Sequence, residues 1–150
     1  SATNLRHIPG LQRLSDAMHR HGAKLFVQLH HPGKETSSRL LGGVQPVSAS
    51  VLPNSKGEMP RALSTEEVQE LVRKFVSGAM IASTAGVDGV EIHAAHSYLV
   101  NQFLSPKYNQ RSDAYGGSPE KRIDHRRPYC CGGGGCGGGG WPWAGSGTVT

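Results

Sequence analysis

The sequence predicts an α/β fold with parallel strands, because one pattern occurs twice. Residues 8–22 carry apolar side chains at helical spacing, and the apolar run 24–29 follows them. Residues 65–86 repeat the helical spacing, and a second apolar run at 90–92 comes next. A helix that leads through a short turn into a continuous apolar strand is typical of a buried parallel sheet. We therefore expect two successive helix–strand units with parallel, buried strands.

Both predicted helices carry end signals. Gly22 is expected to end the first helix, and Gly86 the second. Ser64 and Glu67 have the spacing of a capping box, in which each side chain bonds the backbone N–H of the other residue. The second helix is therefore expected to begin directly after Ser64.

The remaining segments are shorter or irregular. Gly, Pro and Ser recur throughout residues 30–63, so we expect a long functional loop there, with a short hairpin inside it. Residues 98–104 suggest a helical turn. Ser118 and Pro119 are typical of an N-cap and a first helical position, and predict another helix start.

The composition changes from about residue 124 onward. Ten of the 21 glycines of the chain lie in residues 124–150. Such a segment cannot bury enough apolar surface to order itself. It is either a Gly-rich linker or a non-native sequence such as a shifted reading frame. We favour the second interpretation, because the helix that begins at Pro119 breaks off without a stop signal.

Polar side chains follow the second predicted strand. His93, His96 and Tyr98 come directly after residues 90–92, and Gln28 lies near the end of the first strand. Loops at the carboxyl ends of parallel strands face the substrate in α/β enzymes. These four residues are therefore the candidates for an active site.

Each candidate also has a plainer interpretation. The His-x-x-His spacing alone suits half of a zinc site, which His30 and His31 would complete. Tyr98 alone would be a core residue with its hydroxyl at the surface. Gln28 alone would be a polar strand end.

Composition and charge exclude several classes of protein. The formal charge of +5 is spread along the chain without a basic stripe, which argues against nucleic-acid binding. Residues 1–150 contain no apolar run long enough for a membrane span, and we expect a cytoplasmic protein without a membrane partner. Cys130, Cys131 and Cys136 lack the spacing and the fourth ligand of an iron–sulfur cluster, and no metal is expected.

Five segments in order resemble the Old Yellow Enzyme family of FMN-dependent ene-reductases, also called NADH:flavin oxidoreductases. The pattern is closest to the branch with two histidines, which includes enzymes similar to 2,4-dienoyl-CoA reductase. The matching segments are residues 26–34, 89–99, 102–106, 109–117 and 118–122.

The resemblance implies a (β/α)₈ TIM barrel of which this chain holds only part. The matching region lies around the third and fourth strands, so the barrel would be incomplete. Residues 1–123 would form a partial FMN-binding domain, and residues 124–150 the aberrant tail.

The resemblance also implies roles. His93 and His96 would both donate hydrogen bonds to a substrate carbonyl oxygen, and Tyr98 would donate a proton to the α-carbon. Gln28 would contact FMN, which NADH or NADPH would reduce. The substrate would be a small enone or enoyl compound, and the full-length enzyme a possible homo-oligomer. The isolated chain is expected to be inactive, and one alternative is a fragment without cofactor.

A loop further on is expected to serve structure rather than chemistry. Arg111 and Asp113 are placed to form an ion pair that orders residues 109–117.

Overall fold

The structure is a computed structural model that describes residues 3–123. The predicted tail at 124–150 lies outside the described residues. The described chain divides into two compact units. The first comprises residues 3–29 and 70–92, and the second comprises residues 30–69 and 93–123.

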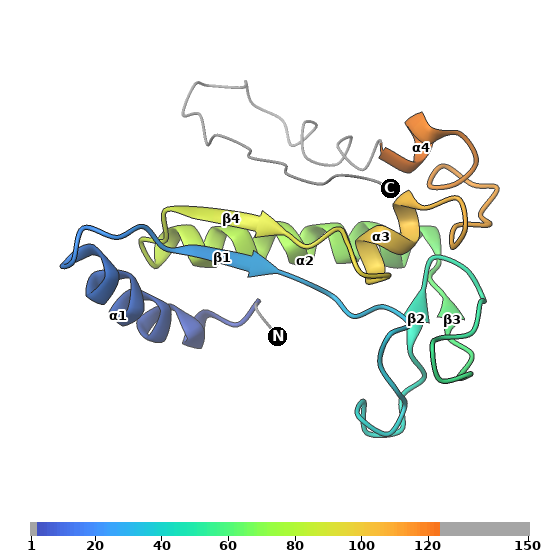
Figure 1. Ribbon diagram of the computed structural model, residues 1–150, viewed down its shortest axis with the longest axis horizontal. Helices are drawn as coiled ribbons and strands as arrows, with labels where there is room; N and C mark the ends of the chain where they lie inside the picture. Colours follow the sequence, from blue (N-terminus) through green and yellow to red (C-terminus); the bar gives the residue numbers. More distant parts are fainter. Residues whose placement is uncertain (1–2, 124–150) are drawn as a thin grey trace. The chain divides into compact units, whose positions relative to one another are not determined.

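The first unit contains the first predicted helix–strand pair and, except for the start of its helix at residues 65–69, the second pair as well (Figure 1). Helix α1 spans Ile8–His19 and follows a short 3₁₀ turn, η1, at Leu5–His7, while strand β1 spans Phe26–Leu29. Helix α2 spans Thr65–Thr84, and strand β4 spans Gly89–Ile92. Strands β1 and β4 pair in parallel, with Phe26 opposite Gly89 and Leu29 opposite Ile92. The prediction of an α/β arrangement with parallel strands is confirmed.

A small apolar core holds this unit together. Ala82, Ala85 and Val87 are buried at its centre. Partly buried residues of both helix–strand pairs pack against them: Ile8, Leu11, Leu25, Val27 and Val90. The end of α2 and the turn that follows it thus pack with Val27 of β1 and Val90 of β4.

The expectation that β1 is buried is correct for only one of its faces. Phe26 is 62% exposed, and Gln28 is also exposed, whereas Leu29 is buried. Successive strand residues point to opposite faces, so the face that carries Phe26 and Gln28 is uncovered while the other packs on the core. The apolar composition of the run therefore did not reveal which face is covered.

The predicted helix ends are confirmed. Glu67 N–H donates to Ser64 Oγ at 3.2 Å, and Ser64 N–H donates to Glu67 Oε2 at 2.8 Å, which completes the capping box. Gly22 and Gly86 both adopt positive φ after the helices end, at 71° and 74°. A chain reversal at positive φ is what glycine permits at low cost.

Asp88 connects the two helix–strand pairs of the first unit. Its carboxylate accepts hydrogen bonds from His19 Nε2 at 2.6 Å, Lys24 Nζ at 2.8 Å and Leu25 N–H at 2.9 Å. The hydrogen bond with His19, followed by those from Leu25 and Lys24, holds the pKa of Asp88 well below its usual range. The carboxylate thus fixes the end of α1 and the start of β1 to the turn before β4.

The second unit consists mostly of loops with short regular elements. Strands β2, Val47–Ser48, and β3, Arg61–Ala62, pair with each other, and helices α3, Leu99–Leu104, and α4, Pro119–Ile123, follow. The pairing of β2 with β3 is parallel, so the expected hairpin is wrong. A hairpin needs a tight reversal, and the long connection through residues 49–60 lets the chain return in the same direction instead.

The core of the second unit lies around helix α3. Leu99 and Phe103 are buried on α3, and the rings of Phe103 and Tyr115 meet edge to face with centroids 6.4 Å apart. Leu63 and Ala49 are buried as well. Within residues 3–123, no helix has the length and apolar character that crossing a membrane requires.

Candidate active site

Four aromatic side chains of the second unit form one cluster, called the ring cluster below: His30, His93, His96 and Tyr98. The ring centroids of His93 lie 5.0 Å from Tyr98 and 5.2 Å from His96, and those of His96 and Tyr98 are 6.4 Å apart. His30 lies 4.5 Å from Tyr98 and 5.8 Å from His93. The structure therefore brings together three of the predicted site residues.

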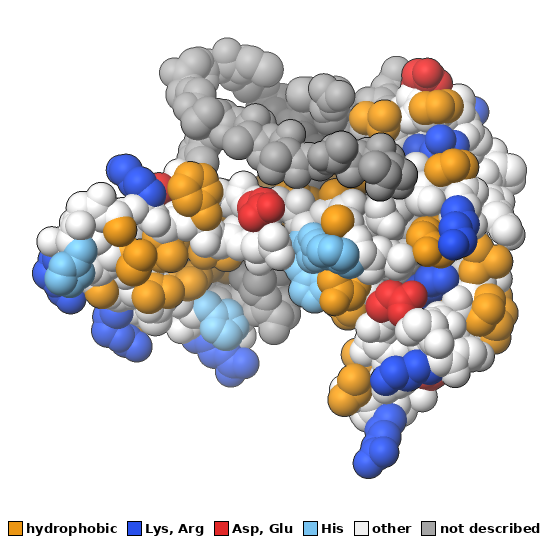
Figure 2. All heavy atoms as spheres, in the orientation of Figure 1, with side chains coloured by type: hydrophobic (Ala, Val, Ile, Leu, Met, Phe, Trp, Pro, Cys, Tyr) orange, Lys and Arg blue, Asp and Glu red, His pale blue; other side chains and the backbone are white. Residues whose placement is uncertain are grey.

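The two predicted oxygen-binding imidazoles contact each other. His96 Nδ1 lies 3.3 Å from His93 Nε2, and in this state one of the two nitrogens donates to the other. Figure 2 shows histidine side chains in pale blue on the face drawn, and in the ring cluster His30 and His96 are exposed while His93 is half-buried. A ligand oxygen can thus reach this pair from solvent.

The Tyr98 phenol is half-buried. In the described part of the chain, no other group forms a hydrogen bond with its hydroxyl. Its O–H is therefore available to an incoming molecule.

The turn that carries His96 is backbone-strained. His96 and the next residue, Ser97, both have positive φ, at 55° and 57°. For non-glycine residues this conformation costs about 1–2 kcal/mol each. Hydrogen bonds hold the turn: Tyr98 N–H donates to Ala95 O at 3.2 Å, and Asn101 Nδ2 donates to Ala94 O at 3.2 Å. Strain of this kind concentrates at functional sites.

A buried amide supports the turn. Gln102 on α3 is fully buried, accepts a hydrogen bond from Ser48 Oγ at 3.0 Å, and donates through Nε2 to Ser97 O. Gly33 makes room for this amide, because a Cβ at Gly33 would lie 2.5 Å from Gln102 Nε2. The sequence analysis missed Gln102, whose burial no periodic pattern indicates.

His30 is a second residue that the sequence analysis did not assign to the site. It follows β1 as His93 follows β4, and the two strands end at the paired residues Leu29 and Ile92. This matching position was the available signal. His31 instead orders the loop, since its Nδ1 accepts from Gly33 N–H and its carbonyl accepts from Leu99 N–H, both at 3.0 Å.

Gln28, the predicted cofactor contact, belongs to the first unit. It is exposed on the uncovered face of β1, and no other side chain or backbone group of residues 3–123 forms a hydrogen bond with its amide. Both the donor and the acceptor of the amide are therefore free to bind a ligand.

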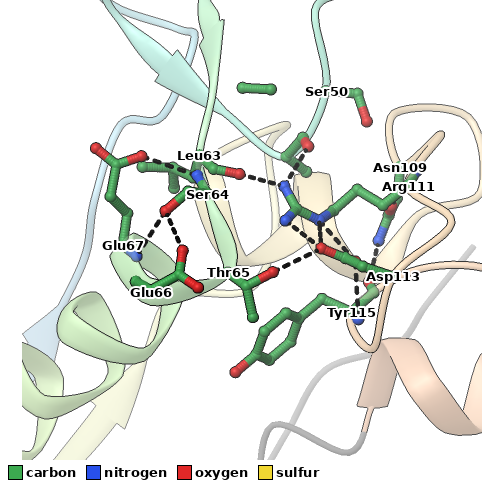
Figure 3. A network of polar contacts seen from close by, with 12 residues as sticks. Ser50, Leu63, Ser64, Thr65, Glu66, Glu67, Asn109, Arg111, Asp113 and Tyr115 are labelled. Atoms are coloured by element: carbon green, nitrogen blue, oxygen red, sulfur yellow. Dashed lines mark hydrogen bonds and ion pairs between the residues drawn. The ribbon is translucent and has the colours of Figure 1, made fainter.

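The predicted Arg111–Asp113 ion pair is confirmed (Figure 3). The Arg111 side chain is 9% exposed and also donates to the carbonyls of Ala49 and Leu63. Arg111 is the main reason that the pKa of Asp113 is lowered, and Thr65 Oγ1 also donates to that carboxylate at 3.1 Å. The network ties residues 109–115 to the start of α2.

An open hollow of about 530 Å³ adjoins the ring cluster. His96 and Tyr98 contribute to its lining. The other lining residues come from four loops of the second unit: Lys34, Glu35, Pro53, Asn54, Ser55, Ser97, Lys107 and Tyr108. The part of the chain that the structure describes contains no group of three His, Cys, Asp or Glu residues placed to hold a metal ion.

Comparison with known proteins defines the class of this protein. A sequence model of the NADH:flavin oxidoreductase / NADH oxidase family matches residues 3–127. The chain belongs to this family.

Individual relatives agree with this assignment. The chain is 44% identical over 119 residues to an NADH oxidase of Thermoanaerobacter brockii and 45% identical over 121 residues to an NADH:fumarate oxidoreductase of Klebsiella pneumoniae. It is 43% identical over 116 residues to an NADPH dehydrogenase of Halalkalibacterium halodurans. These alignments cover 79%, 79% and 77% of this chain, but only 18%, 13% and 33% of the relatives. The chain thus spans a third or less of the length of these proteins.

Proposed function

We propose that this chain carries the substrate-activating part of an FMN-dependent oxidoreductase that reduces a C=C bond conjugated to a carbonyl group. NADH or NADPH would be the reductant. The observation that carries the proposal is the convergence of His93, His96 and Tyr98 in one ring cluster beside an open hollow. The name of the relative that acts on fumarate supports it, because fumarate is an alkene conjugated to carboxyl groups.

The imidazole pair has the spacing to bind one oxygen atom. His96 Nδ1 and His93 Nε2 are 3.3 Å apart, so an oxygen about 2.9 Å from each would accept two hydrogen bonds. Both nitrogens must then carry hydrogen, and the contact between them is replaced by contacts with the oxygen. Two donors on a carbonyl oxygen draw electron density from the conjugated C=C bond and make its β-carbon electrophilic.

Tyr98 would supply the proton. Its ring lies 5.0 Å from His93 between centroids, and no internal hydrogen bond engages its hydroxyl within residues 3–123. A phenol holds its proton at neutral pH and can transfer it to the α-carbon while the β-carbon receives hydride. The products are the saturated carbonyl compound and a phenolate that water reprotonates.

One residue of this chain, Gln28, has a side chain that suits contact with FMN. The amide of Gln28 is exposed and has a free donor and a free acceptor, which match the alternating polar edge of a flavin ring. When bound, the flavin would supply hydride that originates from NADH or NADPH. Gln28 would orient the ring edge.

The fold of the intact protein is also a proposal. Parallel pairing of β1 with β4, joined by helix α2, suits two neighbouring strands of a (β/α)₈ barrel. The uncovered face with Phe26 and Gln28 would then point to the barrel interior or the cofactor.

The test is ligand binding by the imidazole pair. In a full-length homologue loaded with FMN, phenolic ligands mimic an enolate, and their binding changes the visible flavin spectrum. Replacing both residues that match His93 and His96 by Ala is expected to weaken phenol binding at least about a hundredfold, because two hydrogen bonds to a charged oxygen are lost. Replacing the residue that matches His31 by Ala is the control. Unchanged phenol binding in the double variant would overturn the proposal.

A second candidate is that the isolated chain binds no cofactor. The 62% exposure of Phe26 on a two-stranded sheet favours it. Titrating the purified chain with FMN distinguishes the two, because a folded site quenches flavin fluorescence and a chain without a site leaves it unchanged. Metal analysis of the same sample tests the zinc alternative.

A further inference from the structure

The hollow beside the ring cluster is lined by more positive than negative side chains. Lys34 and Lys107 contribute two ammonium groups to its lining, and Glu35 contributes one carboxylate. Glu35 Oε2 accepts a hydrogen bond from Ser55 Oγ at 2.9 Å. The lining therefore has an excess of positive charge, which attracts an anion.

Lys34 is a buried cation without a carboxylate partner. It is 5% exposed, and its Nζ donates to Pro53 O at 2.8 Å. In the part of the chain that the structure describes, no Asp or Glu forms an ion pair with Lys34. Burying an ammonium group is costly unless it is paired and hydrogen-bonded. An anion bound in the hollow would complete its environment.

Both ammonium groups lie close to the Tyr108 ring. Lys34 Nζ is 4.4 Å and Lys107 Nζ is 5.4 Å from the centre of its ring. Its hydroxyl oxygen accepts a hydrogen bond from Ser97 Oγ at 3.0 Å, which leaves the phenolic O–H to donate. That hydrogen bond, with smaller contributions from the charges of Lys107 and Lys34, lowers the pKa of Tyr108 and makes its O–H a better donor to an anion.

We propose that the hollow binds a carboxylate group of the substrate, with Tyr108 and Lys107 as its donors and the buried ammonium of Lys34 as a further positive charge. This inference rests on the proposed function, and it makes the substrate class an unsaturated carbonyl compound that bears a carboxylate. Two donors suit the two oxygens of a carboxylate. His96 and Tyr98 line the same hollow, so the carboxylate and the reacting carbonyl can belong to one small molecule.

The test uses the purified chain and two probes of equal shape, benzoate and benzamide, which differ in charge. Binding is followed by NMR shifts of the labelled chain. Benzoate is expected to bind about tenfold more tightly than benzamide, because hydrogen bonds to a charged group are the stronger ones. Equal affinities for the two probes would overturn the proposal.

Single substitutions test whether Lys107 and Tyr108 cause the preference for benzoate over benzamide. Lys107→Met and Tyr108→Phe are each expected to weaken benzoate binding about five- to tenfold and to leave benzamide unchanged, since each removes one donor to the anion. Lys56→Met is the matched control, because Lys56 is an exposed lysine of the same unit that does not line the hollow. An equal loss in the control would mean general attraction by a basic chain, and would also overturn the proposal.

A last variant separates this inference from the proposed function. The double variant His93→Ala and His96→Ala removes the imidazole pair but none of the carboxylate donors. It is expected to keep the tenfold preference for benzoate. Loss of the preference would place the anion at the imidazoles and overturn the hollow as its site. Failure of the proposed function would appear instead as unchanged phenol binding in the full-length homologue, which leaves the benzoate result intact.

Discussion

The absence of a side chain at Gly33 allows the buried Gln102 amide to pack against its backbone. Gly33 has φ of 60°, and an added Cβ would lie 2.5–2.8 Å from atoms of the Gln102 amide. That amide holds Ser97 O and accepts from Ser48 Oγ. Gly33 therefore meets two requirements at once, a left-handed backbone and a close approach.

Gly33→Ala is expected to destabilise the protein by about 2–5 kcal/mol, the sum of the left-handed backbone cost and of crowding in a packed site. Gly42→Ala is the control, because Gly42 has φ of 66° but no atom within 4 Å of the added Cβ. The control should cost only about 1–2 kcal/mol. Urea unfolding measures both, and equal costs would show that the Gln102 contact is unimportant.

The sequence indicated part of the site at this scale. His93, His96 and Tyr98 were found because they follow a recognisable strand. His30 and Gln102 were not, since their roles depend on which loops meet in space. A one-dimensional pattern contains no information on a fully buried amide that bonds a serine far along the chain.

At the scale of elements, the start of helix α2 depends on one carboxylate. Glu67 accepts from Ser64 N–H and from both terminal nitrogens of Arg61. The hydrogen bond with Arg61, and then that with Ser64, lower the pKa of Glu67 from 4.5 to about 2. The charged form is favoured in the folded state, so this stabilisation is complete above pH 4.5 and is lost as the pH falls toward about 2.

Glu67→Gln keeps the geometry of the capping box but removes the charge. The variant is expected to be less stable than the parent at pH 7, and the gap should close as the pH is lowered from 4.5 toward about 2. Thermal unfolding of both proteins across this range measures it. A gap that stays constant with pH would mean that charge contributes nothing at this helix start.

The loop after α3 depends on a buried cation in a similar way. Arg111 bonds Asp113 and two backbone carbonyls, and it is nearly inaccessible to water. Arg111→Met is expected to cost about 1–3 kcal/mol, because it removes the ion pair with Asp113 and leaves two backbone carbonyls without this donor. Lys74→Met breaks the exposed pair with Glu70 and should cost only about 0.3–0.5 kcal/mol. Denaturant unfolding compares the two, and equal costs would contradict the structural role of Arg111.

The predicted elements largely agree with the observed ones, for a physical reason. Capping boxes, glycine stops and helical spacing are local, and both long helices obey them. The hairpin expected in residues 30–63 was wrong in strand direction, because β2 and β3 have two residues each and their parallel pairing joins distant parts of a loop. Short strands without alternation give no periodic signal.

For the whole molecule, the sequence predicted that β1 and β4 run parallel but not which strand face is covered. Phe26 and Val27 are adjacent in an apolar run, yet Val27 packs on the core and Phe26 is exposed. Coverage is decided by neighbours in space, and β1 has one strand neighbour, β4, in the described part of the chain.

This contrast gives a test on one strand. Phe26→Thr is expected to change the free energy of unfolding by less than about 0.5 kcal/mol, because the ring is already exposed and Thr suits a strand. Val27→Ala should cost about 2 kcal/mol through lost packing. Urea unfolding of the 150-residue chain measures both. A larger cost at Phe26 than at Val27 would show that the outer face is covered.

The left-handed backbone of the adjacent residues His96 and Ser97 affects where the protein first loses its structure on warming. Their turn stores free energy that a few hydrogen bonds, chiefly those of Gln102 and Asn101, must offset. On warming, this turn should relax before either unit unfolds, so that the ring cluster loses its arrangement before denaturation. A stabilised variant is therefore better sought by reinforcing this turn than by enlarging the core.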